Sequence, residues 1–138
     1  MNILSLFSPI IKVSEFVHCR LHQKPVFRVT LDNKNLSKAA VLTIGIWVKN
    51  LSSISHNIVR IAGELEQYPN SFRISIVDSK YRLPIVLNPM DPERIIVFIG
   101  EVLEKVPSDN LEWNIVITLY SRWKGEEIAA GKLRFTLK

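Results

Sequence analysis

Cysteine is nearly absent from this sequence. Cys19 is the single one in 138 residues, so no disulfide can form within the chain. The first residues also lack the charged start and the small-residue cleavage site of a secretory signal. Together these absences predict an intracellular protein in a reducing compartment, which we take to be the cytoplasm.

Long apolar runs are missing as well. No uncharged run approaches the roughly 20 residues of a membrane-spanning helix, so we expect no transmembrane segment. The sequence is 47% apolar and 22% charged, which is typical of a globular protein, and its length suits a single domain. We expect an apolar N-terminal segment at residues 1–22 and one folded domain at residues 23–138.

The motifs of common catalytic and cofactor sites are absent too. Neither the Gly-x-x-x-x-Gly-Lys phosphate loop nor the Gly-x-Ser-x-Gly nucleophile turn occurs. His18 and His22 are four residues apart and would share one face of a helix, but a structural zinc needs four ligands and the chain has no second pair of His or Cys residues. We therefore expect no metal, no cofactor and no enzymatic activity.

The N-terminal segment carries apolar residues at helical spacing, among them Leu6, Phe7 and Ile10. This pattern predicts a short helix or extension. The helix would either close one end of the protein's own core or serve as a handle for a partner or a membrane surface. Lys12 is the single cation of the first dozen residues, which favours the first alternative over a membrane helix.

From Pro25 onward the apolar residues alternate with a period of two, as in β-strands. The segment around 42–48 is apolar on one face and partly apolar on the other, which predicts a central strand. The polar residues 32–35 predict a turn, residues 58–65 predict one continuous strand, and Lys124-Gly125 predicts a tight turn between the last two strands. The whole pattern predicts about eight strands, within a range of 7–9, and no long helix between them.

Three stretches carry a resemblance to a known class of fold. They are VLTIGIWVKNLSSISHNIVRIAGEL, LPIVLNPMDPERIIVFIGEV and EWNIVITLYSRWKGEEIAAGKLRFTLK. In order and spacing of strands, residues 25–138 resemble an immunoglobulin-like or fibronectin-type-III-like β-sandwich, although the cysteine pair of antibody domains is absent. The resemblance implies an all-β antiparallel sandwich that serves as a binding or spacer module.

The loop in WVKNLSSISHNIVRI gathers Asn, Ser and His side chains between two predicted strands. Ser55 and His56 could belong to a hydrolase site, yet local sequence supplies no acid to orient His56. Asn and Ser side chains also satisfy the backbone groups of turns. We interpret the loop as a turn and keep a hydrolase as a third, weaker hypothesis.

Our first hypothesis is a non-enzymatic module that binds another protein or a second copy of itself. Large aromatic side chains outside the main alternation would give such a module its anchors. The alternative is a small basic domain that binds single-stranded nucleic acid, because the net charge is +5 and aromatic and cationic residues are interleaved. The candidate interaction residues of the two hypotheses are Leu6, Phe7, Ile10, Trp47, Arg60, Arg122, Trp123 and Lys124.

Overall fold

The protein is an all-β molecule. The computed structural model describes residues 23–36, 41–68, 71–76, 82–102 and 113–137. Over these ranges the chain forms nine strands, which confirms the predicted fold class. The expected N-terminal helix, with Leu6, Phe7 and Ile10, lies outside the described residues.

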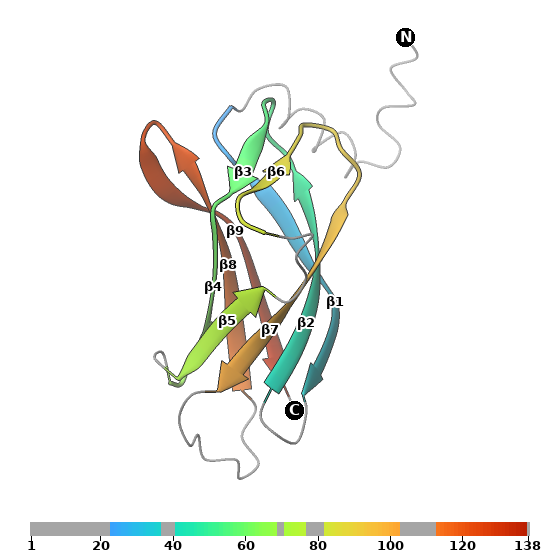
Figure 1. Cartoon of the computed structure of the whole chain (residues 1–138), viewed down its shortest axis with the longest axis vertical. Helices are drawn as coiled ribbons and strands as arrows, with labels where there is room; N and C mark the ends of the chain where they lie inside the picture. The colour runs from blue at the N-terminus through green and yellow to red at the C-terminus, as the bar shows by residue number, and fades with distance from the viewer. Residues whose placement is uncertain (1–22, 37–40, 69–70, 77–81, 103–112, 138) are drawn as a thin grey trace.

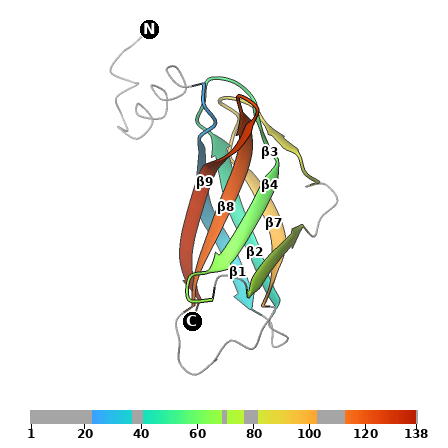
Figure 2. The same cartoon turned by 90° about the vertical axis from the view of Figure 1, so that its left-hand side faces the viewer.

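The nine strands form three antiparallel sheets (Figure 1). Their bounds are β1 (Phe27–Leu36), β2 (Val41–Asn50), β3 (His56–Ile58), β4 (Arg60–Leu65), β5 (Phe72–Ile76), β6 (Ile85–Leu87), β7 (Arg94–Val102), β8 (Trp113–Trp123) and β9 (Glu126–Leu137). The two larger sheets, β1-β2-β7-β5 and β4-β8-β9, lie face to face (Figure 2), and the small sheet β3-β6 lies at one end.

The core lies between the two larger sheets. On β2, Leu42, Ile44 and Ile46 are fully buried, as their alternation predicts. On β8, Ile115 and Ile117 are equally buried and belong to the same cluster. β2 lies between β1 and β7, so its predicted central position is confirmed. Apolar burial from both sheets is what holds the sandwich together.

A glycine lets one aromatic ring into this core. Gly100 lies on β7 opposite Ile74 of β5. A Cβ atom on Gly100 would lie 2.1 Å from Cζ of Phe72, closer than any real contact. The ring of Phe72, which is buried, therefore occupies the space that a side chain at Gly100 would fill.

The predicted turn at residues 32–35 is wrong. β1 continues through these residues to Leu36, with an irregularity in its register between Leu31 and Asn33. β1 is an edge strand, and residues 32–36 are exposed, so polar side chains there lose no contact with water. A bulge of this kind at an edge lets a strand carry residues that resemble a turn.

The predicted continuous strand at residues 58–65 is divided in two. β3 pairs with β6, whereas β4 pairs with β8. The change of partner occurs at Val59, whose N–H still donates to the carbonyl of Tyr120 at 2.8 Å. Ile58 and Ile61 are both buried although they are three positions apart, so the inward face shifts by one residue at the division. A reading of 58–65 as one strand with a period of two did not reveal this shift. We call this point the fork: here the edge of β8, paired with β4 up to Arg60, has no paired strand beyond it, because β3 pairs with β6 instead.

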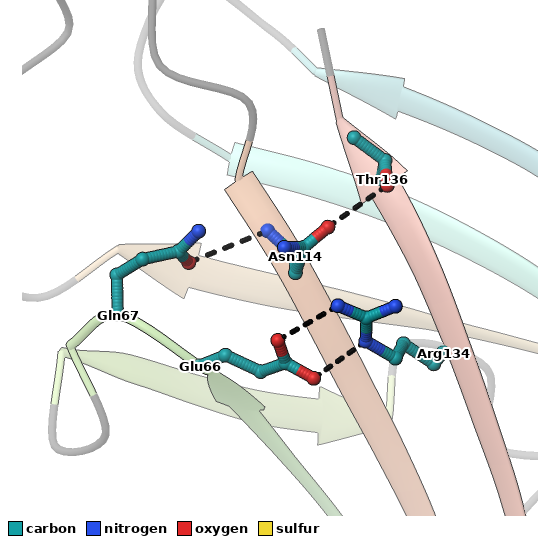
Figure 3. A network of polar contacts seen from close by, with 5 residues as sticks. All are labelled: Glu66, Gln67, Asn114, Arg134 and Thr136. Atoms are coloured by element: carbon teal, nitrogen blue, oxygen red, sulfur yellow. Dashed lines mark hydrogen bonds and ion pairs between the residues drawn. The ribbon is translucent and has the colours of Figure 1, made fainter.

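A polar network ties the three strands of the β4-β8-β9 sheet at the end away from the fork (Figure 3). Arg134 on β9 donates two hydrogen bonds to the carboxylate of Glu66, at 2.6 and 3.0 Å. The hydroxyl of Thr136 donates to the side-chain oxygen of Asn114 at 2.9 Å, and the main-chain N–H of Asn114 donates to Gln67 at 3.4 Å. These contacts fasten the chain after β4 to β8 and β9.

We expect the Glu66–Arg134 pair to make a small, pH-dependent contribution to stability. The hydrogen bonds from Arg134 lower the pKa of Glu66 below its ordinary value of 4.5. Stability from a lowered carboxyl pKa is present above the ordinary value and is lost as the pH falls through the folded-state value. Glu66→Gln should therefore be less stable than wild type at neutral pH, and this difference should shrink below pH about 4.

Urea unfolding of the two proteins between neutral and acidic pH measures this difference. The side chains are exposed to solvent, so the effect should be small and should weaken with added salt. A difference in stability that stays constant over the whole pH range would contradict the assignment.

Candidate functional site

The Asn/Ser loop between β2 and β3 is organised by one buried amide. Asn50, only 2% exposed, donates from Nδ2 to the carbonyls of Ile54 at 3.0 Å and Leu87 at 2.9 Å. Its Oδ1 accepts the N–H of Ser52 at 2.8 Å. These bonds satisfy main-chain groups on both sides of the loop, as expected for a turn former, and they bind the loop to β6.

A second contact fastens the same loop to the turn after β6. The hydroxyl of Ser55 donates to Oδ1 of Asn88 at 2.8 Å. The loop is thus held at the C-terminal end of β6 by two neighbouring residues, Leu87 and Asn88, and His56 follows it immediately as the first residue of β3. The polar loop serves as a rigid support for His56.

His56 lies across the fork from the end of β8. Its ring meets the ring of Trp123 edge to face, with centroids 5.9 Å apart and planes at 72°. Its Nε2 lies 2.6 Å from the carbonyl of Gln23, so that nitrogen carries the proton and donates it. The histidine is buried, and it braces β3 against β8 from the inner side of the fork.

The β8–β9 hairpin presents Trp123 and Lys124 at its tip. Lys124 and Gly125 both have positive φ angles, 52° and 81°, as in a two-residue type I′ turn. The tight turn predicted at these two residues is therefore confirmed. Nζ of Lys124 lies 5.5 Å from the centre of the Trp123 ring, within the range of a cation–π contact.

Arg60 and Tyr120 form a stacked pair on the outer face of the β4-β8-β9 sheet. The guanidinium of Arg60 lies 3.8 Å from the centre of the Tyr120 ring. Its Nε donates to Glu127 of β9 at 2.6 Å, and this hydrogen bond is the main cause of the raised pKa of Arg60. Arg60 is therefore already neutralised and held in place by β8 and β9.

Arg122 differs from Arg60 in this respect. Its side chain is exposed, and among the described residues no carboxylate lies within ion-pair distance of it. It borders a depression of about 220 Å³ at the fork. The residues that line the depression are Ser55, His56, Asn57, Val59, Ser121 and Arg122.

We call the group His56, Tyr120, Arg122, Trp123 and Lys124 the hairpin site. Of the candidate interaction residues, the structure brings Arg122, Trp123 and Lys124 into it, and Arg60 stacks against its Tyr120. The site lies at the end of the sandwich where the β8–β9 hairpin leans away from β3 and β6 (Figure 1).

Trp47 is separate from this group. It alternates with buried Ile46 and Val48, so it lies on the outer face of the four-stranded sheet. It is half-buried, and its Nε1 donates to Oδ1 of Asp32 at 2.8 Å. Leu6, Phe7 and Ile10 are outside the described residues, so the structure does not place them.

Most described arginines on the sheet faces are paired with glutamates. The pairs are Arg28–Glu93, Arg60–Glu127, Arg73–Glu101 and Arg134–Glu66. Each is exposed and contributes little to stability. Their effect on recognition is larger. Because a glutamate neutralises each of these arginines, they do not present an open basic surface to a ligand.

The described residues also contain no group of three or more His, Cys, Asp or Glu side chains arranged to hold a metal ion. His18, Cys19 and His22 lie outside the described residues. In the described part of the chain, no helix has the length and apolarity needed to cross a membrane.

The contacts of His56 also bear on the hydrolase hypothesis. Its hydrogen bond goes to the carbonyl of Gln23 and its ring contact goes to Trp123. Ser55, the hydroxyl next to it in sequence, donates to Asn88 instead. Among the described contacts, neither a hydroxyl nor a carboxylate is joined to His56 as a nucleophile or an orienting acid would be.

No protein-family model matches the sequence, and a search of curated proteins finds no relative. The assignment of function therefore depends on the geometry of the site.

Sequence reasoning missed two residues that shape the hairpin site. Ser121 was not singled out, although it lies in the wall of the depression. Glu127 was not among the candidate residues either, yet it neutralises Arg60, which is 67 positions away in sequence. No local pattern pointed to this pair, since only the pairing of β4 and β9 with β8 brings the two side chains together.

Proposed function

We propose that this chain is a non-enzymatic interaction domain that binds a protein through the hairpin site. The observation that carries the proposal is the arrangement at one end of the sandwich, where Trp123 contacts both His56 and Lys124 and where Arg122 borders the same depression as His56. Tryptophan, tyrosine and arginine are the residues that most often dominate the energy of protein interfaces. The turn holds the main chain of these residues, and the contact with His56 positions Trp123, which reduces the entropy lost on binding.

Exposed apolar side chains at the same end of the sandwich support the proposal. Ile54 precedes β3, Val86 lies on β6 and Met90 lies in the turn after β6, with exposures of 40%, 49% and 60%. Exposed apolar side chains near polar and aromatic ones are typical of contact surfaces. The likeness to immunoglobulin-like sandwiches, which bind through the loops at one end, supports the same assignment at the level of architecture.

The test of this proposal compares Trp123→Ala with Trp47→Ala. Sedimentation velocity over a range of concentrations measures self-association, and affinity capture from an extract of the protein's own cells measures binding to other proteins. We expect Trp123→Ala to weaken the interaction about 30-fold or more, as for an interface anchor, and Trp47→Ala to leave it unchanged.

Circular dichroism of both variants checks that they are folded. The proposal is contradicted if neither assembly nor capture depends on Trp123 while both variants retain the wild-type spectrum.

Single-stranded nucleic acid is the second candidate ligand, because Lys124 lies over the ring of Trp123, and Tyr120 and Arg122 share the outer face of β8. Two phosphate contacts would give log K a slope of about −1.4 against log salt, or about a sevenfold loss between 50 and 200 mM. Anisotropy of a labelled oligonucleotide measures this slope. The Arg–Glu pairs of the sheet faces favour the protein ligand, since they remove most described arginines from phosphate binding.

A further inference from the structure

One edge of β8 loses its neighbouring strand at the fork. β4 pairs with β8 from Leu65 to Arg60, and the register ends at Arg60 opposite Tyr120. β3 then pairs with β6. On the other side β8 remains paired with β9 as far as Trp123 opposite Glu126. The last residues of β8 are therefore paired with a strand on one side only. On the other side β3 lies beside them, with His56 in contact with Trp123, but the two strands share no hydrogen-bonded register.

The hairpin turn shows which main-chain groups face the open edge. In a two-residue hairpin the residues that flank the turn exchange hydrogen bonds, and every second pair does so thereafter. Trp123 and Ser121 therefore direct their main-chain groups to β9. Arg122 directs its N–H and C=O to the opposite edge, the same edge on which Tyr120 accepts the N–H of Val59.

The depression of about 220 Å³ lies at this edge. Its volume is well above the roughly 10–15 Å³ that a single water needs. Asn57 and Arg122 on its rim are exposed, and His56 and Ser121 are buried beneath them. The hydroxyl of Ser121 is the one buried side-chain polar atom without a hydrogen-bond partner among the described residues. The fork thus contains unsatisfied polar groups of both main chain and side chain.

The hairpin at the fork has a small net positive charge, because Glu126 offsets only one of the two cations Arg122 and Lys124. The guanidinium of Arg122 has no carboxylate partner among the described residues, and Lys124 is exposed at the tip of the same hairpin. Glu127, the nearest acid in the strand register, binds Arg60 instead. A ligand with a carboxylate would supply the anionic partner that Arg122 lacks among the described residues.

We propose that the fork binds an extended acidic peptide segment, which adds to the open edge of β8 as a short strand. The main chain of the peptide would pair with the N–H and C=O of Arg122, and a carboxylate of the peptide would pair with its guanidinium. Strand addition of this kind obtains affinity from main-chain hydrogen bonds and specificity from neighbouring side chains. The inference rests on the proposed protein-binding function and specifies the chemistry of the partner.

Two measurements on the ¹⁵N-labelled protein test the proposal. In the free protein, the amide of Arg122 should exchange with D₂O faster than the amides of Ser121 and Trp123, which bond to β9. An acetylated pentapeptide of alternating valine and glutamate should then shift the Arg122 amide resonance saturably, with a Kd on the order of 1 mM, and slow its exchange. The same peptide with lysine in place of glutamate should not bind at this edge.

Arg122→Gln keeps the strand and the main-chain donor but removes the charge. It should weaken binding of the acidic peptide two- to fivefold, as for an exposed ion pair, while Lys132→Gln, an equal change of charge elsewhere on the same sheet, should not. A protected Arg122 amide in the free protein overturns the proposal. So does the absence of a saturable shift at Arg122, or equal binding of the two peptides.

These outcomes are independent of the test of the proposed function. If the peptide fails to bind but Trp123→Ala still abolishes assembly or capture, the interaction domain stands and the strand addition is wrong. If neither test succeeds, the proposed function fails as well.

Discussion

Replacing Phe98 with alanine is expected to lower the free energy of unfolding by about 3–5 kcal/mol. Phe98 is fully buried on the central strand β7, where it lies between Ile44 of β2 and Ile76 of β5 in the sheet register. Removal of the ring forfeits its burial from water and leaves a cavity that a close-packed core fills only in part. Since domains are typically stable by about 5–15 kcal/mol, this one substitution removes a large fraction of the total.

Urea unfolding followed by tryptophan fluorescence and circular dichroism measures the effect. Val97→Ala is the control, because Val97 is the next residue on the same strand but faces outward and is half-buried. It should cost about 1 kcal/mol or less. Equal losses for the two variants would show that Phe98 does not lie at the centre of the core.

The second large effect is expected at Asn50, where Asn50→Ala should cost about 2–4 kcal/mol. The substitution would leave the carbonyl of Leu87 and the N–H of Ser52 without their partners. Buried polar groups that lose a hydrogen bond forfeit their hydration as well, so the cost exceeds that of an ordinary surface bond. Chemical unfolding measures it.

Two further variants test this explanation: Asn50→Asp changes the same buried side chain, and Asn57→Ala is the exposed control. Aspartate keeps the acceptor but loses both donors and places a charge in a buried position, so at neutral pH it should be at least as damaging as alanine. Asn57 is exposed on β3, and its substitution should change stability by less than about 0.5 kcal/mol. If Asn50→Ala is as mild as Asn57→Ala, the loop is held by other contacts.

The faces of the strands followed from the sequence. The alternation of Leu42, Ile44 and Ile46 predicted which side of β2 is buried, and the same held for Ile115 and Ile117 on β8. Burial of one face of a strand demands apolar residues at every second position, so this pattern is visible in any single strand. The turn at Lys124-Gly125 was equally visible, because positive φ angles favour glycine.

The boundaries and partners of strands were less accessible. The polar run at 32–35 suggested a turn, but an edge strand with a bulge accommodates the same residues. The segment 58–65 suggested one strand, but it divides at Val59 between two partners. In both cases the local pattern is compatible with two structures, and contacts with distant strands select one of them.

In the candidate site, too, the chemistry of each residue was visible in the sequence, but the arrangement of the residues in space was not. Arg60, Arg122, Trp123 and Lys124 were each chosen for their chemistry. The sequence contains no information on whether they converge, since Arg60 is more than sixty positions from its partner Glu127. Pairing of β4 and β9 with β8 brought these four residues to one end of the sandwich, and it left Trp47 on another face.

The sequence by itself determined that this protein is an antiparallel all-β fold, which residues of its central strands face the core, and where its last hairpin turns. The tertiary structure alone decided which strands are neighbours, where β3 leaves β8 and which cations remain without a carboxylate among the described residues. The physical reason is that a period of two specifies the face of a residue but not the strand beside it. Neighbours are selected by the packing of the whole core, and the fork with its open edge is a consequence of that selection.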